Sequence, residues 1–325
     1  MRPEVTRYLV GAAAMSAMIA LVPARTETAA QLRVVRLRNS FIEQFKNRAT
    51  VSGLKFRIGR VKQAVNTIGA GGEDGDLHMS GRPGSEVALP MVAEIVNAGL
   101  KLKGGGLSDP QKAVALAKPL KANTEVTMSG VWRLWFEHPP SVTLVQGQTV
   151  PLPTTTNPDH IFEIHPVTEF NGQSTVASFV PIPGYTAYAA AKAFGAYEKL
   201  QFRVNKGSAF TTVASTKAGY NYTEFDAVLA GNAIDMNDGV FVLANILDKK
   251  GGKSVVASPR RLVFAKDTPA ARVFVAGNHK KGAAWRLLGI PRVNLDKLMA
   301  DAEEHRGEDV SVRGTYEMIV VGVIQ

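Results

Sequence analysis

Two histidines of this sequence each follow a carboxylate by two positions. Asp76 precedes His78 in the segment DGDLH, and Glu163 precedes His165 in the segment FEIHP. Both segments have strand-like alternation, and side chains two positions apart on a strand point to the same face. If these strands are neighbours, the four side chains converge on one surface. Imidazoles with carboxylates suit zinc, manganese or iron, and they can also serve as a general acid–base pair.

The first half of the chain holds four histidines that are candidate metal ligands: His78, His138, His160 and His165. Their spacing matches no standard metal motif such as H-E-x-x-H. A strand histidine beside an aspartate is also the pattern of a structural hydrogen-bonding pair, and we favour that interpretation from the sequence. We therefore predict no cofactor, with a divalent metal as the alternative.

A second group of residues combines aromatic rings with positive charge. Trp132, Arg133 and Trp135 lie on one segment, and exposed aromatic rings beside arginine can stack on bases or sugars. The alternative is that tryptophans on a central strand belong to the core. Arg33 and Arg36, in a basic stretch near the N-terminus, are further candidates for binding an anionic polymer.

The elements that position these residues are mainly strands. The first half predicts three strands, one helix and two strands, at residues 51–60, 75–81, 89–96, 111–118, 125–136 and 161–170. This is the order of an OB-like barrel, in which the helix lies between the third and fourth strands. The fold class predicted is therefore mainly β with added helices.

The second half of the chain shows a similar pattern. Strands are predicted at 200–205, 209–216, 239–247 and 285–292, with helices at 186–200, from 268 and at 294–305. Aligning the halves matches Gly130 with Gly289 and Arg133 with Arg292, whereas Ile319 stands where His165 would align. We predict two OB-like barrels in tandem, with any histidine site in the first barrel only.

The N-terminus has the pattern of a secretory signal peptide. Arg2 and Arg7 precede an uncharged run of about 15 residues, which is shorter than the roughly 20 needed to span a bilayer. We predict a signal peptide at 1–24 with cleavage up to residue 30, a basic helix or arm at 25–49, and OB-like domains at 50–185 and 186–325. The expected location is periplasmic or secreted, with no membrane span in the mature chain.

Composition excludes several classes of site. The chain has no cysteine, so disulfides, thiolate zinc sites and cysteine nucleophiles are absent. It contains no G-x-S-x-G elbow, dinucleotide-binding fingerprint or phosphate-binding loop motif. The formal net charge is +10, which favours anionic partners such as nucleic acid or acidic polysaccharide.

Three segments resemble the signatures of a broad set of secreted bacterial proteins of uncharacterised function. Residues 74–79 (DGDLHM) and 89–95 (LPMVAEI) resemble a D-x-D-x-H…M-x-A-E-I signature, and 162–168 (FEIHPVT) resembles E-[IL]-H-P-V. The resemblance implies no particular reaction. It implies that Asp76, His78, Glu94, Glu163 and His165 are the catalytic candidates to test first.

The function expected first is a non-enzymatic exported module that binds an anionic polymer, either nucleic acid or an envelope glycan. The alternative is a metal-dependent hydrolase, nuclease-like in character, that uses the histidines and carboxylates of the first half. A second alternative is an envelope scaffold protein without a ligand of its own. The sequence leaves open whether the protein is an enzyme.

Overall fold

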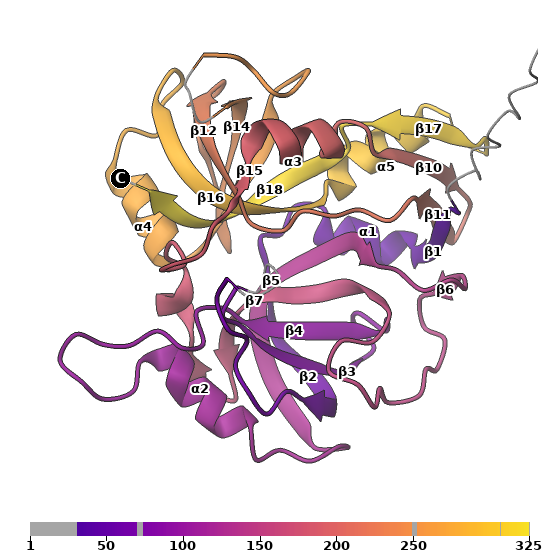
Figure 1. The fold of residues 1–325 in the computed structure, drawn as a ribbon. Helices are drawn as coiled ribbons and strands as arrows, with labels where there is room; N and C mark the ends of the chain where they lie inside the picture. Colours follow the sequence, from indigo (N-terminus) through magenta and orange to yellow (C-terminus); the bar gives the residue numbers. More distant parts are fainter. Residues whose placement is uncertain (1–30, 70–73, 249–251, 306, 325) are drawn as a thin grey trace, which may run out of the picture. The chain divides into compact units, whose positions relative to one another are not determined.

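The structure of the chain, a computed structural model, describes residues 31–69, 74–248, 252–305 and 307–324 (Figure 1). The predicted signal peptide, residues 1–24 with cleavage up to residue 30, lies outside the described residues. Among the helices that the structure describes, none has the length and apolar character needed to cross a bilayer. Residues Leu32–Gln325 group into one compact unit, which contains both predicted barrels.

Five strands of the first half close into a β-barrel with the strand order predicted from the sequence. β2 pairs with β3 and β5, β3 pairs with β4, and β7 joins β5 to β4 through a parallel β4–β7 pair. Helix α2 lies between the third and fourth strands, as in an OB fold. The bounds are β2 Thr50–Val61, β3 Leu77–Pro83, β4 Met91–Ile95, α2 Asp109–Ala117, β5 Glu125–His138 and β7 His160–Phe170.

The second half forms another closed five-stranded barrel with the same connections. β12 pairs with β14 and β16, β14 pairs with β15, and β18 joins β16 to β15 through a parallel pair. The prediction of two OB-like barrels in tandem is confirmed. The bounds are β12 Thr223–Leu229, β14 Gly239–Leu247, β15 Arg260–Ala265, α4 Pro269–Ala276, β16 Ala284–Val293, α5 Leu295–Glu303 and β18 Tyr316–Ile324.

The two glycines matched in the sequence occupy the same strand of each barrel and have the same reason to be glycine. Gly130 lies on β5, where an added Cβ would come 2.3 Å from a methyl carbon of Ile164 on the neighbouring strand. Gly289 lies on the equivalent strand β16, where an added Cβ would come 2.7 Å from the carbonyl oxygen of Ile319. In both barrels the next strand approaches too closely for a side chain.

The two matched arginines also occupy equivalent positions. Arg133 lies opposite Glu163 in the β5–β7 pair, and Arg292 lies opposite Glu317 in the β16–β18 pair. Both arginines form an ion pair with that glutamate, with closest N–O distances of 2.6 Å in each case. All four side chains are buried, so both barrels retain the same buried ion pair.

The two barrels contact each other through these same strands in a reciprocal way. Arg133 Nε donates a hydrogen bond to the carbonyl oxygen of Pro291, at 2.9 Å. In return, Arg292 Nη1 donates to the carbonyl oxygen of Trp132, at 3.0 Å. Because Trp132 and Pro291 each precede the matched arginine by one position, the two contacts are equivalent in the two halves. The buried arginines therefore link the barrels as well as stabilising each one.

A third sheet lies outside the barrels and corrects part of the prediction. Its order is β17-β10-β11-β1-β6. The strands predicted at 200–205 and 209–216 belong to this sheet, and not to the second barrel, whose first strand was missed at 223–229. The predicted basic helix or arm at 25–49 contains strand β1 before a short helix. The bounds are β1 Arg33–Arg38, α1 Asn39–Phe45, β6 Leu144–Val145, β10 Gln201–Lys206, β11 Phe210–Ser215 and β17 Val310–Arg313.

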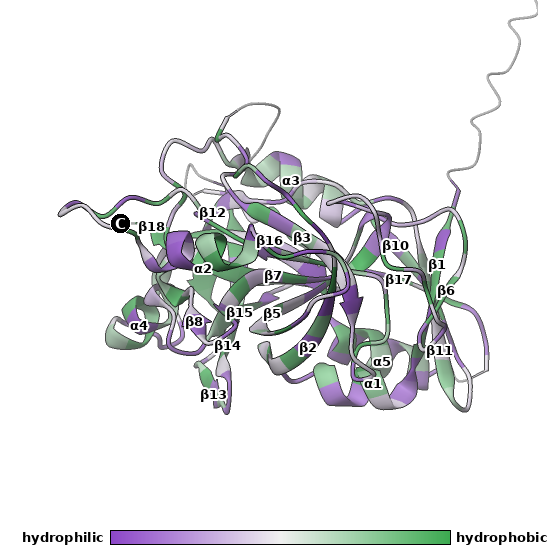
Figure 2. Ribbon diagram, turned by 90° about the horizontal axis from the view of Figure 1, so that it is seen from below, coloured by the Kyte–Doolittle hydropathy of each residue, from purple (hydrophilic) through white to green (hydrophobic). Residues whose placement is uncertain are grey.

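The remaining elements are short. They are β8 Gln173–Ser174, a 3-10 helix Val176–Ser178, β9 Tyr188–Ala189, α3 Ala190–Tyr197 and β13 Ile234–Met236. Helix α5 shows how helices cover the core, since it buries Leu295, Leu298, Met299 and Ala302. The hydrophobic and hydrophilic residues of α1 and α5 alternate accordingly in Figure 2. Each fully buried leucine contributes about 1.5–3 kcal/mol through removal from water.

Candidate functional site

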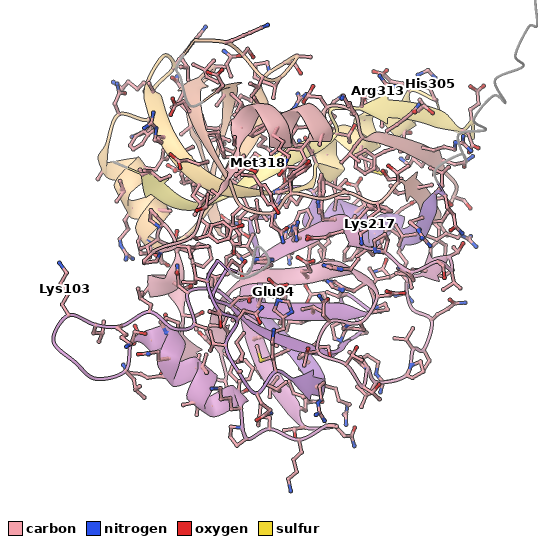
Figure 3. The ribbon with its side chains drawn as sticks, viewed as in Figure 1. Glu94, Lys103, Lys217, His305, Arg313 and Met318 are labelled. Carbon is pink, nitrogen blue, oxygen red and sulfur yellow. The ribbon has the colours of Figure 1, made fainter. Side chains whose placement is uncertain are left out.

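The predicted histidines and carboxylates converge on one end of the first barrel. His78 on β3 lies directly opposite Glu94 on the antiparallel strand β4. β4 in turn pairs in parallel with β7, where Ala93 lies opposite Ile164, one residue before His165. This register places Glu94 between the two histidines. Figure 3 shows Glu94 among the side chains of the first barrel.

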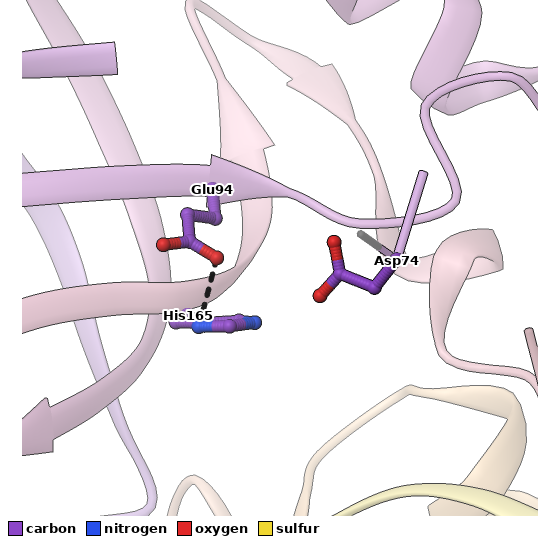
Figure 4. A group of neighbouring side chains, drawn as sticks. All are labelled: Asp74, Glu94 and His165. Atoms are coloured by element: carbon purple, nitrogen blue, oxygen red, sulfur yellow. Dashed lines mark ion pairs between the residues drawn. The ribbon is translucent and has the colours of Figure 1, made fainter. Parts of the chain in front are cut away.

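Glu94 contacts both imidazoles, one with each carboxylate oxygen. Its Oε2 lies 3.0 Å from Nδ1 of His165, and its Oε1 lies 3.6 Å from Nε2 of His78. Figure 4 shows the carboxylate of Asp74 beside this pair, next to the ring of His165. The donor atoms of Asp74, Glu94 and His165 all lie within 4.8 Å of one another, which is close enough for one metal ion.

His78 forms a separate pair with Asp76. Nε2 of His78 lies 2.5 Å from Oδ2 of Asp76, and the other oxygen of Asp76 accepts a hydrogen bond from Nδ2 of Asn66 at 2.6 Å. Asp76 is almost fully buried, whereas the side chain of His78 is 16 % exposed. Asp76, His78 and Glu94 also have donor atoms within 4.8 Å of one another. His78 is therefore the member of the cluster that solvent reaches most easily.

The second barrel supplies one side chain to the cluster. Tyr222, immediately before β12, places its hydroxyl 2.7 Å from Nε2 of His165. Nδ1 of the same ring faces Glu94 and, at 3.3 Å, Oε2 of Glu163. Both Tyr222 and His165 are fully buried. The ring is therefore held in one orientation, with Nδ1 directed toward the carboxylates.

The carboxylates strongly affect protonation in the cluster. Burial lowers the pKa of His78, but the charges of Glu94 and Asp76 outweigh it and raise this pKa to about 10. For His165, burial again opposes the charge of Glu94, and the net effect raises the pKa well above its ordinary value. Burial and repulsion by Asp76 and Glu94 raise the pKa of Asp74 well above its usual range. On their own, these side chains therefore hold several protons that a cation can replace.

Glu163 belongs to a neighbouring structural network. Its carboxylate pairs with Arg133 at 2.6 Å and with Nε2 of His160 at 3.0 Å. Burial raises the pKa of Glu163, but Arg133 and the histidines outweigh this effect and hold it well below its usual range. Arg133 also binds Asn221 at 2.7 Å and Glu137 at 3.2 Å. Arg133 is thus fully engaged inside the protein.

The interpretation of Trp132, Arg133 and Trp135 as a ligand-stacking surface is corrected by their burial, since each is at most 1 % exposed. Trp132 donates its Nε1 hydrogen to the carbonyl oxygen of Arg48 and lies under the guanidinium of Arg292, 3.7 Å from the ring centroid. Both sides of this strand are covered, because α1 and α3 pack on its tryptophans and the second barrel packs against Trp132 and Arg133.

The other two predicted metal ligands, His138 and His160, stack on each other with ring centroids 5.3 Å apart. His160 is fixed by Glu163 and by the carbonyl oxygen of Pro158. Among the described residues, neither histidine belongs to a group of donors that can share one ion with Glu94. The structure thus brings together the five catalytic candidates but places these two histidines beside them.

The second barrel provides an internal comparison, because the strand pairings of the two barrels match. Glu163 and Glu317 occupy equivalent positions, so His165 corresponds to Ile319. On β15, Val263 lies opposite Ile319 of β18 and pairs with Phe241 of β14. Val263 therefore occupies the position that Glu94 has in the first barrel. The equivalents are Gly239 for Asp76, Phe241 for His78, Val263 for Glu94 and Ile319 for His165. The barrel fold therefore forms with an apolar set at the positions of the cluster.

A cavity of about 470 Å³ adjoins the cluster. Asn66, which holds Asp76, forms part of its wall, as does Gly75, which lies between the two aspartates. The other lining residues are Val65, Thr67, Ile68, Asn97, Gly99, Leu100, Lys101 and Pro183. A small ligand in this cavity would lie next to Asp76, which immediately precedes β3, the strand that carries His78.

Two members of the cluster were not predicted from the sequence. Asp74 begins the DGDLH segment, so its position beside the predicted Asp76 was a usable signal. Tyr222 lies 57 residues from His165 and had no such signal. Its contribution depends on how the second barrel packs against the first.

Comparison with known proteins gives no matching family model and no match among proteins of curated function.

Proposed function

We propose that the first barrel binds a divalent transition-metal ion through Asp74, Glu94 and His165, and that the protein is a metal-dependent hydrolase. The observation that carries the proposal is the position of Glu94 between His165 and His78, together with the apolar set at the same positions of the second barrel. Residues needed only to fill a barrel would not require four ionisable groups at the positions where Gly239, Phe241, Val263 and Ile319 suffice.

The donor set and its spacing suit such an ion. Two ligands at about 2.1 Å from one ion lie about 3.0–3.4 Å apart, depending on the coordination geometry. Oε2 of Glu94 and Nδ1 of His165 are 3.0 Å apart. One imidazole with two carboxylates favours zinc, manganese or iron over calcium, which prefers oxygen ligands alone. Tyr222 holds His165 in the orientation that directs Nδ1 to the ion.

His78 and Asp76 supply the acid–base chemistry in this proposal. A metal ion with three protein ligands leaves positions for water, and it lowers the pKa of that water enough to generate hydroxide near neutral pH. His78 faces the other oxygen of Glu94, is partly exposed and is held by Asp76. Because its pKa is raised to about 10, it would be protonated near neutral pH and placed to donate a proton to the leaving group.

Phosphodiester hydrolysis is the reaction class to test first. A divalent ion offsets the negative charge that develops on phosphoryl oxygens, and the net charge of +10 attracts anionic substrates. The proposed location remains periplasmic or secreted.

The experiment separates binding from catalysis. The protein is treated with a chelator, reloaded with Zn²⁺ or Mn²⁺, and assayed with bis(p-nitrophenyl) phosphate alongside a metal analysis. Glu94→Gln should lose both metal and activity, whereas His78→Gln should keep the metal and lose activity. Glu125→Gln, an exposed glutamate on β5, is the matched control and should behave as the wild type.

Stoichiometric metal without hydrolysis would limit the proposal to metal binding. A fully folded protein that takes up no metal would overturn it and return the non-enzymatic polymer-binding module to first place.

A further inference from the structure

The five-stranded sheet outside the barrels has an unusual charge composition. Its strands β1, β6, β10, β11 and β17 contain no aspartate or glutamate, yet they carry five arginines and one lysine. By contrast, barrel strands such as β5 and β7 each carry two glutamates. The positive charge of this sheet is therefore not offset by acidic residues on its own strands.

Four of these arginines lie on the same, outward face. On β1, Val35 and Leu37 are buried, so Arg36 and Arg38 point to the opposite side. On β10, the exposed Arg203 alternates with buried neighbours in the same way. Residues directly opposite each other on paired strands share a face of the sheet. Arg203 lies opposite Ala214 on β11 and opposite Ser311 on β17, so these residues belong to the same face.

The fourth arginine, Arg313, extends the row at the far edge. It lies opposite Gln201, two residues before Arg203 on the adjacent strand, and Figure 3 labels it on β17. The four guanidinium groups follow a diagonal from Arg313 through Arg203 to Arg36 and Arg38. From strand spacings of about 4.8 Å and rises of about 3.4 Å per residue, this arginine row is about 25 Å long.

The residues of the arginine row have no ion-pair partner among the described residues, although surface arginines elsewhere do. Arg57 pairs with Glu125 and Arg286 pairs with Asp226. The carboxylate of Asp309, at the edge of the sheet, accepts a hydrogen bond from Asn205. Unpaired arginines on an open sheet face leave their hydrogen-bond donors available to an external anion.

We infer that this face binds a linear acidic polysaccharide along the arginine row. Between the arginines lie Gln201, Asn205, Thr212 and Ser311, whose amides and hydroxyls suit the hydroxyl groups of sugars. The one ring on this face, Phe210, is covered by the guanidinium of Arg36 at 5.2 Å from its centroid. Because no free ring is presented for stacking, the face suits a sugar polymer better than single-stranded nucleic acid.

Strand β1 separates the two arginines that the sequence interpretation grouped, Arg33 and Arg36. Arg33 and Arg36 were predicted together as ligands of an anionic polymer, but they are three positions apart on a strand and so point to opposite faces. Arg33 lies on the side of Val35 and Leu37 and is half-buried. Arg36 is therefore the member of that pair that belongs to the proposed surface.

The test measures binding of a fluorescein-labelled heparin oligosaccharide by anisotropy at several salt concentrations. The variant R36A/R203A/R313A should bind at least about ten-fold more weakly and show a smaller dependence of log Kd on log salt, because fewer counterions are released. The control K103A/K112A/K121A removes the same charge from the loop labelled by Lys103 in Figure 3, from α2 and from the segment after α2, and it should bind as the wild type.

Three results would overturn the inference. The first is absence of heparin binding by the wild type at low salt. The second is equal loss in both triple variants, which would show a response to net charge alone. The third is tighter binding of poly(dT) than of heparin by the wild type, with the same loss in R36A/R203A/R313A, which would assign the face to nucleic acid. Circular dichroism verifies that each variant is folded.

Discussion

Replacing the cluster by the residues of the second barrel tests whether the first barrel needs it for stability. The variant carries the equivalents Phe for His78, Val for Glu94 and Ile for His165. It also carries Asp74→Asn, Asp76→Asn and Tyr222→Phe, so that no buried carboxylate of the cluster loses its cation and the hydroxyl of Tyr222 is not left without a partner. The comparison variant is Glu94→Val alone, which removes one member and leaves the others in place.

The two variants are expected to change the free energy of unfolding by different amounts. Removing one member of a buried charge network costs about 3–5 kcal/mol, because the remaining charges stay buried without compensation. His165 keeps Glu163 at 3.3 Å, so we take the lower end, about 3 kcal/mol, for Glu94→Val. Exchange of a whole buried network for apolar residues is often neutral or stabilising. The six-fold variant should therefore lie within about 1 kcal/mol of the wild type or above it.

Urea unfolding followed by tryptophan fluorescence measures both values, since Trp132 and Trp135 are buried in the same barrel. Equal slopes of free energy against urea would show that the variants unfold from comparable states. A second version with His78→Leu controls for the larger volume of phenylalanine. If both six-fold variants are less stable than Glu94→Val, the cluster is a structural requirement and the functional reasoning is refuted.

Three further predictions follow from the same contacts. Metal uptake at pH 7 should release a proton from His165, because its pKa is raised well above the ordinary value. Calorimetry in buffers of different ionisation enthalpy measures this release, and a value near zero would contradict it. In chelator-treated protein, His78 should stabilise the fold fully below pH 6.5, and this stabilisation should be lost as the pH rises toward about 10. The reason is that the pKa of His78 is raised in the folded state. The melting temperature of His78→Gln should accordingly fall less over this pH range than that of the wild type. Arg133→Met should cost about 3–5 kcal/mol in urea unfolding, because it leaves Glu163 buried without its main cation; a loss below 1 kcal/mol would show that this ion pair is dispensable.

The barrel order was predictable because the relevant strands alternate strongly and are bounded by turn residues. Val51 to Arg60 and Ile161 to Phe170 show this pattern, and α2 carries a capping box at Ser108. The alternation also gave the faces of His78 and His165, which is why the site could be approached from the sequence. Glu94, by contrast, was identified only through the resemblance, since nothing local shows that it lies between two histidines.

The features that the sequence interpretation missed or misplaced share one cause, which is packing between distant segments. β1 was missed because its buried residues, Val35 and Leu37, are separated by arginines that resemble a charged arm. Trp132 and Trp135 were expected at a surface on one interpretation, but Phe45 of α1 and Arg292 of the second barrel cover Trp132, and Tyr197 of α3 packs against Trp135. The role of Tyr222 likewise depends on packing between distant segments. A sequence pattern reports the face of a strand, but it does not report what packs against that face.

Anomalous X-ray diffraction from crystals soaked with Mn²⁺ or Zn²⁺ tests the central claim most directly. The metal site is predicted to give one strong anomalous peak about 2.0–2.2 Å from Nδ1 of His165 and from a carboxylate oxygen of Glu94, with Asp74 as a further ligand. The same soak of Glu94→Gln crystals should give no peak there. A wild-type map without density between Glu94 and His165, or with the ion bound only at surface residues, would contradict the account.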